Sequence, residues 1–366
     1  MKTLYFKVEF DLLNIKTSQR GAINPLWLIT LLIIISVAFI VYRMEVSQTQ
    51  VTDDKTSLEN ETVKMNSGSE FYKLSTAAIS PDKLSSASLA YSVDSIDKYE
   101  ITVTDDVIYE LNVAHFKTEN SEEKKAIVFI PSDLNERGKP VVGSDKSSQY
   151  RYEKWLEAAE AIKEYTPEES LFVSFWDNAQ RIELFTGREV WTSLPEKEAY
   201  ASEQEQSLWQ SVAGGFDSEG KSKKFAQYLL MDMASAVTEL KQQLPENKVS
   251  YLLVTTDDLA HVQELAILKG ESLPLETRVF PANADMHNSI SKVKDWAKDG
   301  DGTGSYLVQP ISDQSIRVWR ITDKAFEDSL LIRALPFTSS LDKPFEHLKL
   351  VYQSDWGSYL SIFEIQ

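Results

Sequence analysis

The longest apolar stretch of the chain lies near its N-terminus. Residues 22–42 contain no charged side chain, and their centre, Leu26–Val41, is almost wholly apolar. A helix needs about 20 such residues to cross the hydrocarbon core of a bilayer, and it bonds its backbone groups internally. Trp27 and Tyr42 suit the two membrane interfaces. The pattern predicts a single transmembrane anchor over residues 22–42.

Charges on the two sides of this anchor predict its orientation. Four basic residues precede it, whereas only Arg43 and Lys55 follow closely behind. Basic flanks favour the cytoplasmic side, so residues 1–21 are expected in the cytoplasm and the C-terminal mass in the periplasm of a Gram-negative cell. Tyr42–Glu45 offers no cleavage site of small residues, which favours an uncleaved anchor in the inner membrane over a signal peptide.

Beyond the anchor, the pattern divides the chain into three parts. Residues 43–70 are rich in Ser, Thr, Asn, Gln and acidic residues, a composition typical of a flexible stalk. Residues 71–150 alternate between apolar and polar positions, most clearly over Val107–Phe116, and predict a strand-rich subdomain. Residues 151–366 combine short apolar runs with helical spacing and predict a mixed α/β domain.

The apolar runs of residues 151–366 also predict the fold class. Continuous runs at Leu171–Trp176 and Val249–Thr255 are typical of strands buried on both faces. Phe225–Leu244 repeats an apolar residue every three or four positions and predicts one helical stripe, whereas the polar Pro195–Lys224 predicts a surface excursion. We therefore expect an α/β or α+β protein, with one transmembrane helix followed by a mixed β-sheet domain covered by helices.

Composition narrows the possible partners and cofactors. The chain carries 38 basic and 56 acidic residues, a formal charge of -18. Such a surface repels phosphate backbones, which argues against nucleic-acid binding and favours a basic or neutral partner. The absence of cysteine excludes disulfides, thiolate metal sites, iron–sulfur clusters and covalent c-type haem. The four histidines lack the spacing of a metal site, so neither a metal nor another cofactor is expected.

Polar residues gather just after the first buried run. Asp177 falls where a strand is expected to end and a helix to begin, and ligands in open α/β sheets bind outside such strand ends. Trp176, Arg181 and Arg188 would complete a small polar pocket there. The alternative, which the residues alone favour, is that Asp177 caps the helix, Trp176 is core and Gly187 ends the helix.

Three other segments supply candidates for the same pocket. Asp257 and Asp258 follow the second buried run, where they could exchange protons, hold a cation, or simply cap a helix. His287 precedes a helix and could be a base, a ligand or a packed side chain. Asp313 suits a turn, and Arg317 lies on the strand that follows. The candidate pocket comprises Trp176, Asp177, Arg181, Arg188, Asp258, His287, Asp313 and Arg317.

A series of blocks carries a family resemblance. In chain order they are Thr166-Pro-Glu-Glu, Phe175-Trp-Asp, Arg181-Ile-Glu-Leu-Phe-Thr-Gly-Arg188, Met286-His287, Val293-Lys-Asp-Trp296, Val308-Gln-Pro-Ile-Ser-Asp-Gln314, Leu335-Pro-Phe-Thr-Ser-Ser340 and Leu350-Val-Tyr-Gln353. Together they resemble the hydroxylamine oxidation protein HaoB family over residues 150–353. The resemblance implies a membrane-anchored accessory protein, encoded beside the multihaem hydroxylamine oxidoreductase of ammonia and methane oxidisers. It implies no catalytic residues.

A second resemblance concerns the segment Phe175-Trp176-Asp177. It is similar to a Trp-Trp-Asp block in the soluble domain of oligosaccharyltransferases, where that block helps to bind the acceptor peptide. Here Phe175 replaces the first Trp, and the sequence has no multi-span catalytic half. The resemblance therefore implies a peptide-binding fold piece and no glycosyl transfer.

Three functional hypotheses follow. The leading one is a periplasmic, membrane-anchored accessory or docking protein that tethers, matures or organises a multihaem hydroxylamine oxidoreductase. The first alternative is a periplasmic enzyme that uses Asp177 and Asp258 with His287, which requires these side chains to converge around a cleft of ligand size. The second alternative is a peptide- or glycan-binding module around Trp176 and Asp177.

Overall fold

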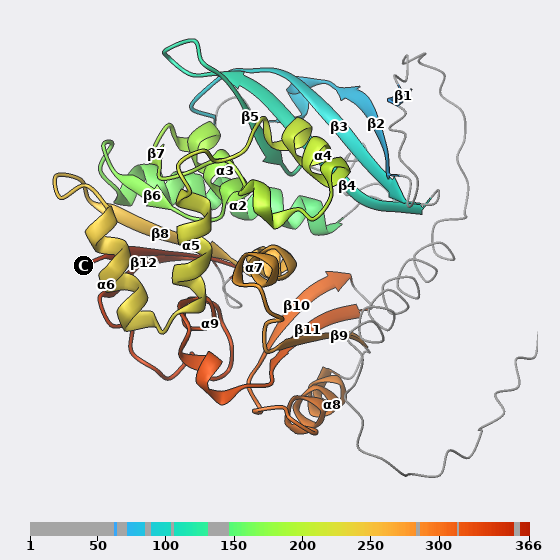
Figure 1. The fold of residues 1–366 in the computed structure, drawn as a ribbon, viewed down its shortest axis with the longest axis vertical. Helices are drawn as coiled ribbons and strands as arrows, with labels where there is room; N and C mark the ends of the chain where they lie inside the picture. The colour runs from blue at the N-terminus through green and yellow to red at the C-terminus, as the bar shows by residue number, and fades with distance from the viewer. Residues whose placement is uncertain are drawn as a thin grey trace, which may run out of the picture. The chain divides into compact units, whose positions relative to one another are not determined.

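The computed structural model of the chain describes residues 62–63, 72–84, 89–103, 106–130, 146–282, 286–312, 315–354 and 359–366. The predicted anchor and most of the predicted stalk lie outside these residues. Among the described residues, no helix is both long and apolar enough to cross a membrane. The described part is a mixed α+β structure with three sheets (Figure 1).

The first sheet is an antiparallel meander whose strands pair in sequence order. Its strands are β1 (Thr62–Val63), β2 (Tyr72–Ile79), β3 (Val93–Val103), β4 (Asp106–Lys117) and β5 (Glu123–Val128). A short 3-10 helix, η1 (Pro81–Lys83), follows β2. Alternation along the strands buries Ala126 and Val128 in one core cluster and Ile127 in another, so both faces of the meander are covered.

The second sheet is mixed, and its strand order is β12-β13-β8-β6-β7. The strands are β12 (Leu348–Gln353), β13 (Leu360–Ile365), β8 (Ser250–Thr255), β6 (Leu171–Val173) and β7 (Glu189–Val190). β6 runs parallel to β7 and β8, whereas β13 runs antiparallel to β8 and β12. β6 and β8 are buried at every position, which explains why their residues are apolar without alternation.

Helices cover both faces of the mixed sheet. They are α2 (Lys146–Tyr165) and α3 (Trp176–Thr186) on one face, and α5 (Lys221–Leu230), α6 (Met233–Gln243) and α9 (Leu330–Ala334) on the other. Alternate strand residues point to the two faces: Phe172 and Tyr251 pack with α2, whereas Val173 and Leu252 pack with α5 and α6.

The third sheet is antiparallel, in the order β10-β11-β9. Its strands are β10 (Tyr306–Ser312), β11 (Ser315–Ile321) and β9 (Leu275–Pro281), and α8 (Met286–Lys298) packs against it. The contact is apolar, through Phe280, Val293 and Val318. The remaining elements are η3 (Lys197–Ala199), α4 (Glu203–Ala213), η4 (Thr256–His261), α7 (Val262–Lys269) and η5 (Lys324–Asp328).

Two predicted elements have different bounds in the structure. The strand predicted over Leu171–Trp176 ends at Val173, and Trp176 is the first residue of α3. The stripe predicted over Phe225–Leu244 is two helices, because Asp232 adopts an extended conformation and caps α6 through the N–H of Ser235. The apolar spacing survives the break because both helices pack on the same face of the sheet.

The surface excursion predicted over Pro195–Lys224 is also partly wrong. Its centre forms α4, which begins at a capping box between Ser202 and Glu205. Leu208 and Val212 of this helix are buried in the same cluster as Ile127 of the meander. The segment is polar because the rest of α4 faces solvent, and three buried positions suffice to anchor an 11-residue helix.

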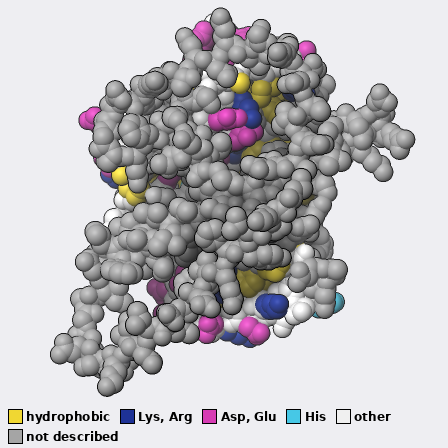
Figure 2. Space-filling model, turned by 90° about the vertical axis from the view of Figure 1, so that its right-hand side faces the viewer, with side chains coloured by type: hydrophobic (Ala, Val, Ile, Leu, Met, Phe, Trp, Pro, Cys, Tyr) yellow, Lys and Arg dark blue, Asp and Glu magenta, His cyan; other side chains and the backbone are white. Residues whose placement is uncertain are grey.

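The surface of the described part carries charges of both signs. Acidic and basic side chains lie next to one another on the face shown in Figure 2. On the meander, Lys98 bridges Glu100 and Glu110 at 3.0 and 2.9 Å. Exposed pairs of this kind contribute about 1 kcal/mol or less each, so the stability of the fold depends mainly on its interior.

Candidate functional site

The carboxyl ends of the parallel strands β6 and β8 lie side by side. Ser174 and Phe175 connect β6 to α3, and η4 follows β8 directly. Since parallel strands end at the same edge of a sheet, the first turn of α3 and the 3-10 turn η4 meet there. Ionisable side chains from both elements form a buried network at this edge.

Asp177 is the centre of one half of the network. Its Oδ2 accepts a hydrogen bond from Nη2 of Arg181 at 2.5 Å, and its Oδ1 lies 3.2 Å from Nε2 of His261. Burial opposes ionisation of Asp177, but the positive charges of Arg181 and His261 outweigh it and hold the pKa of this carboxyl well below its usual range. Asp177 therefore stays ionised.

His261 connects two carboxylates. Its Nδ1 lies 2.9 Å from Oε1 of Glu264, while Nε2 faces Asp177. Burial lowers the pKa of His261, but the negative charges of Glu264 and Asp177 raise it by more than burial lowers it. The pKa of His261 therefore lies well above the usual 6.5. The ring stacks on Phe175, with centroids 4.5 Å apart and planes at 14°. His261 is thus an imidazolium ion at neutral pH.

Asn178 links this half to Asp258. Its Oδ1 accepts from Arg181 at 2.7 Å, and its Nδ2 donates to Asp258 at 2.7 Å. Asp258 also accepts from the backbone and side chain of Thr255, in a capping box that starts η4. Burial raises the pKa of Asp258 to about 7, and the nearby negative charge of Asp177 adds to this effect.

Asp257 forms a separate ion pair with Arg151. It accepts two hydrogen bonds from Arg151 of α2, at 2.5 and 2.9 Å, and one from Tyr359 at 2.9 Å. Although burial opposes ionisation, Arg151 lowers the pKa of Asp257. Gln309 of β10 donates to the Thr256 carbonyl at 2.8 Å, which ties the third sheet to the same turn.

Arg181 extends the network to the meander. β5 is the edge strand of that sheet, and its residue Ile127 faces α3. Nη1 of Arg181 donates to the Ile127 carbonyl at 3.0 Å, while Oε1 of Gln180 accepts from the Ile127 N–H at 3.3 Å. The guanidinium also lies over the rings of Phe129 and Trp155, at 5.0 and 4.9 Å. Two side chains of α3 thus provide hydrogen-bond partners for the backbone N–H and carbonyl of Ile127 on the edge strand.

The structure brings together Asp177, Arg181 and Asp258 from the predicted candidates. Trp176 lies beside them, with its ring centroid 6.0 Å from that of His261, and its predicted place in the core agrees with an exposed fraction of 3%. The prediction that Asp177 caps α3 is wrong, because Phe175 holds the N-cap position and Asp177 bonds Arg181 and His261 instead.

The other predicted candidates lie elsewhere. Arg188 follows α3 at its far end, where Gly187 terminates the helix as predicted, and it donates to the Thr166 carbonyl at 3.1 Å. His287 is exposed in the first turn of α8, and no hydrogen bond or ion pair of Asp177 or Asp258 involves it. Arg317 lies in β11 of the third sheet, and Asp313 lies outside the described residues.

Sequence reasoning missed three members of the network, Asn178, His261 and Glu264. The local signal for His261 was its position three residues after Asp258 and three before Glu264, a spacing that places acids next to it on a helical turn. Its bond to Asp177 joins residues 84 positions apart and has no local signal.

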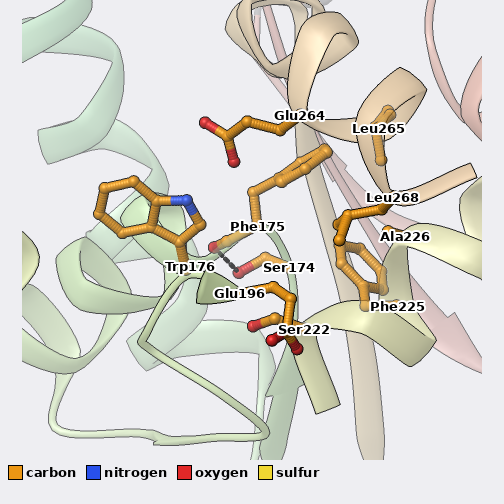
Figure 3. Close-up of a pocket in the computed structure, with 10 residues that line it drawn as sticks. All are labelled: Ser174, Phe175, Trp176, Glu196, Ser222, Phe225, Ala226, Glu264, Leu265 and Leu268. Carbon is orange, nitrogen blue, oxygen red and sulfur yellow. Dashed lines mark hydrogen bonds between the residues drawn. The ribbon is translucent and has the colours of Figure 1, made fainter. Parts of the chain in front are cut away.

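A small hollow of about 20 Å³, with room for about one water molecule, opens beside the network (Figure 3). Phe175, Trp176 and Glu264 line one side of it, and Glu196 and Ser222 line the other. Asp258 is 2% exposed and does not line the hollow. Across the described ranges, no three His, Cys, Asp or Glu side chains gather as a metal site would require.

Comparison with known proteins identifies one family. The model of the family described as HaoA-associated protein HaoB matches residues 51–365, which is most of the chain. No curated protein matches the chain.

The first prediction of the network concerns Arg181, which is only 2% exposed. Replacing it by Met leaves the Ile127 carbonyl unbonded and removes one cation from the buried Asp177. We expect Arg181→Met to lower the free energy of unfolding by about 3–5 kcal/mol, the usual cost of breaking a buried ion pair. Denaturation by urea, followed by tryptophan fluorescence, measures this. The double variant with Asp177→Asn should recover part of the loss; a loss below about 1 kcal/mol in Arg181→Met alone would contradict the assignment.

The second prediction concerns pH. The pKa of Asp258 is raised to about 7 from 3.8, so its contribution to stability is present below about pH 4 and is lost as the pH rises to 7. His261, whose pKa is also raised, loses its contribution only above pH 6.5, and Asp177 loses its own only in acid. When the pH rises from 5 to 7, the free energy of unfolding should therefore fall by about 2 kcal/mol less in Asp258→Asn than in the wild type. Urea titrations at pH 5 and pH 7 measure both changes, and an equal fall in the wild type and in Asp258→Asn would refute this prediction.

Proposed function

The chain belongs to the HaoB family, and we propose that it is a membrane-anchored accessory protein that docks the hydroxylamine oxidoreductase HaoA at the periplasmic face of the inner membrane. The observation that carries the proposal is the family match over residues 51–365, since that family is described as HaoA-associated. The anchor over residues 22–42 and the stalk over 43–70 supply the tether. Beyond the stalk, residues 71–150 and 151–366 form the docking body.

Charge supports a docking role. The chain carries a formal charge of -18, and a partner with a basic face would be drawn to it and oriented by it. Electrostatic attraction of this kind raises association rates more than it raises affinity, which suits a protein that holds a mobile partner near a membrane.

The buried network supports docking over catalysis. Asp177, Asp258 and His261 are satisfied by one another and by Arg181 and Asn178, and Asp258 does not reach the hollow beside them. The catalytic alternative requires His287 to join the two acids, whereas His287 is exposed on α8 and takes no part in their bonds. The network therefore serves mainly to hold α2, α3 and η4 together.

The third prediction tests the association with HaoA. The full chain, tagged at its C-terminus and expressed at native level, is purified from detergent-solubilised membranes. We expect HaoA to co-purify, as detected by immunoblot and haem absorbance. A matched variant in which a cleavable secretion signal replaces residues 1–42 should carry HaoA into the soluble periplasmic fraction. Failure to recover HaoA with the intact chain would overturn the proposal.

The fourth prediction tests the orientation and uses the absence of native cysteine. A membrane-impermeant maleimide, added to cells with a permeabilised outer membrane, should label Glu246→Cys, which lies in an exposed turn of the outer domain. Thr3→Cys should be labelled only after the inner membrane is lysed. Labelling of Thr3→Cys in intact spheroplasts would contradict a cytoplasmic N-terminus.

A further inference from the structure

Strand β9 is an open edge of the third sheet (Figure 1). It pairs with β11 over seven consecutive residues without a bulge, and on its other side no strand of the described chain lies next to it. Thr277, Arg278 and Val279, at its centre, are all exposed. An edge of this kind presents free backbone N–H and carbonyl groups, which pair readily with another extended chain.

The other sheet edges in the described part of the chain are short, distorted or covered. β1 and β7 have two residues each, and β10 and β12 each carry a register shift. The edge of β5 is covered by α3 at Ile127. These are usual means by which proteins prevent pairing between edges. β9 has none of them over Leu275–Val279; only beyond this stretch does Ser289 of α8 donate to the Pro281 carbonyl, at 3.1 Å.

Backbone bonding at the start of β9 indicates which of its groups point outward. The Pro274 carbonyl accepts from the Thr322 N–H at 3.0 Å, in the same register as the rest of the strand pair. The direction of the backbone groups alternates along an antiparallel strand. The even-numbered residues of β9 therefore bond to β11, whereas Leu275, Thr277 and Val279 direct their N–H and carbonyl groups away from it.

The order of side chains along β9 is complementary to its own reverse. Let two copies run antiparallel with Thr277 opposite Thr277. Glu276 of each copy then lies opposite Arg278 of the other, and Leu275 lies opposite Val279. Pairs of opposite charge, apolar pairs and Thr–Thr pairs directly across an antiparallel ladder all stabilise it. Every side chain of this stretch thus meets a suitable partner in a second copy.

Charge selects this register over its neighbours. With the two-fold axis moved to Arg278, two guanidinium groups would lie opposite each other, and with the axis at Glu276 two carboxylates would do so. Like charges directly opposite each other destabilise a strand pair. The register centred on Thr277 is therefore the one that β9 favours.

The side chains of β9 have capacity for such a contact. The Glu276 side chain is 53% exposed and uses its Oε2 to accept from Arg320 of β11 at 2.9 Å. Arg278 is exposed with its guanidinium 5.3 Å from the centroid of the Phe280 ring, and it forms no ion pair with the acids that the structure describes. Val279 is an exposed apolar side chain that a second copy would cover.

We propose that β9 pairs antiparallel with β9 of a second copy of this chain, with Thr277 on the two-fold axis. The two three-stranded sheets then form one continuous sheet across an isologous interface. Thr277 exchanges two backbone hydrogen bonds with Thr277 of the second copy, and Leu275 and Val279 do the same with each other. This self-association does not depend on HaoA.

The size and charge of the contact set its strength. A stretch of five residues on each copy is a small interface, so the dissociation constant is expected to be on the order of micromolar. The net charge of -18 on each copy opposes approach, but at about 0.15 M salt it is screened beyond about 8 Å. The paired charges of β9 are closer than this and keep their attraction.

The first test reverses one charge on the full chain in detergent. Arg278→Glu puts an acid opposite Glu276 at both ends of the contact. Sedimentation equilibrium at up to about 100 µM protein and about 0.15 M salt should show a dimer for the wild type and association at least about tenfold weaker for Arg278→Glu. Arg278→Lys should keep the dimer. Lys349→Glu, the same reversal on the edge strand β12, is the matched control and should leave the dimer unchanged.

The second test restores the contact between two different variants. Glu276→Lys alone should also weaken self-association. In an equimolar mixture with Arg278→Glu, the basic strand of one chain faces the acidic strand of the other, so the dimer should return. A loss of folding in either variant could not produce this recovery. Thr277→Pro removes a central N–H that faces away from β11, so the strand should persist while the dimer is lost; thermal melting checks that each variant is folded.

The outcomes separate cleanly. A wild-type chain that stays monomeric over the whole concentration range overturns the proposal. A dimer that both Arg278→Glu and Thr277→Pro leave unchanged also overturns it, because another surface then carries the contact. Folded single variants whose mixture does not associate overturn the pairing of Glu276 with Arg278.

Discussion

The buried guanidinium of Arg181 is the constraint on which the arrangement of the described domain depends. A full charge that is 2% exposed needs compensating partners, since an uncompensated buried charge costs several kcal/mol. Its partners come from three places: Ile127 on the meander, Asp177 and Asn178 on its own helix, and the rings of Phe129 and Trp155. Any rotation of α3 would break several of these contacts at once. Arg181 therefore ties the meander to the mixed sheet, together with Gln180 and the apolar cluster that α4 shares with Ile127.

The strands and helices of the mixed sheet were predictable because their signals are local. β6 and β8 are buried on both faces and must be continuously apolar, as Leu252 and its neighbours are. β9 gave no such signal, because six of its seven residues are exposed or half-exposed and only Phe280 is buried. The break at Asp232 was hidden for another reason: two helices on the same face repeat the spacing that one long helix would have. Helix α4 was masked by its polar outer face.

The sequence predicted where the candidate site lies, but only some of the residues that form it. Strand ends located Asp177 and Asp258 correctly, since both follow buried parallel strands. His261 joins them through a contact across 84 residues, which depends on the packing of α7 and not on any local pattern. His287 looked equally suitable in sequence, but its helix covers the third sheet. Tertiary packing decides which of the two histidines joins the network.

Two adjacent residues, Trp176 and Asp177, differ in how their polar groups are satisfied. Asp177 points into the network, where each carboxylate oxygen has a cationic partner and little capacity remains for a ligand. Trp176 packs in the meander cluster, but its buried N–H finds no acceptor among the residues that the structure describes. The network fixes the helix start that aims this donor, because His261 stacks on Phe175 and holds Glu264 beside it. A closed set of charges thus fixes the position of a neighbouring donor that the described residues leave unbonded.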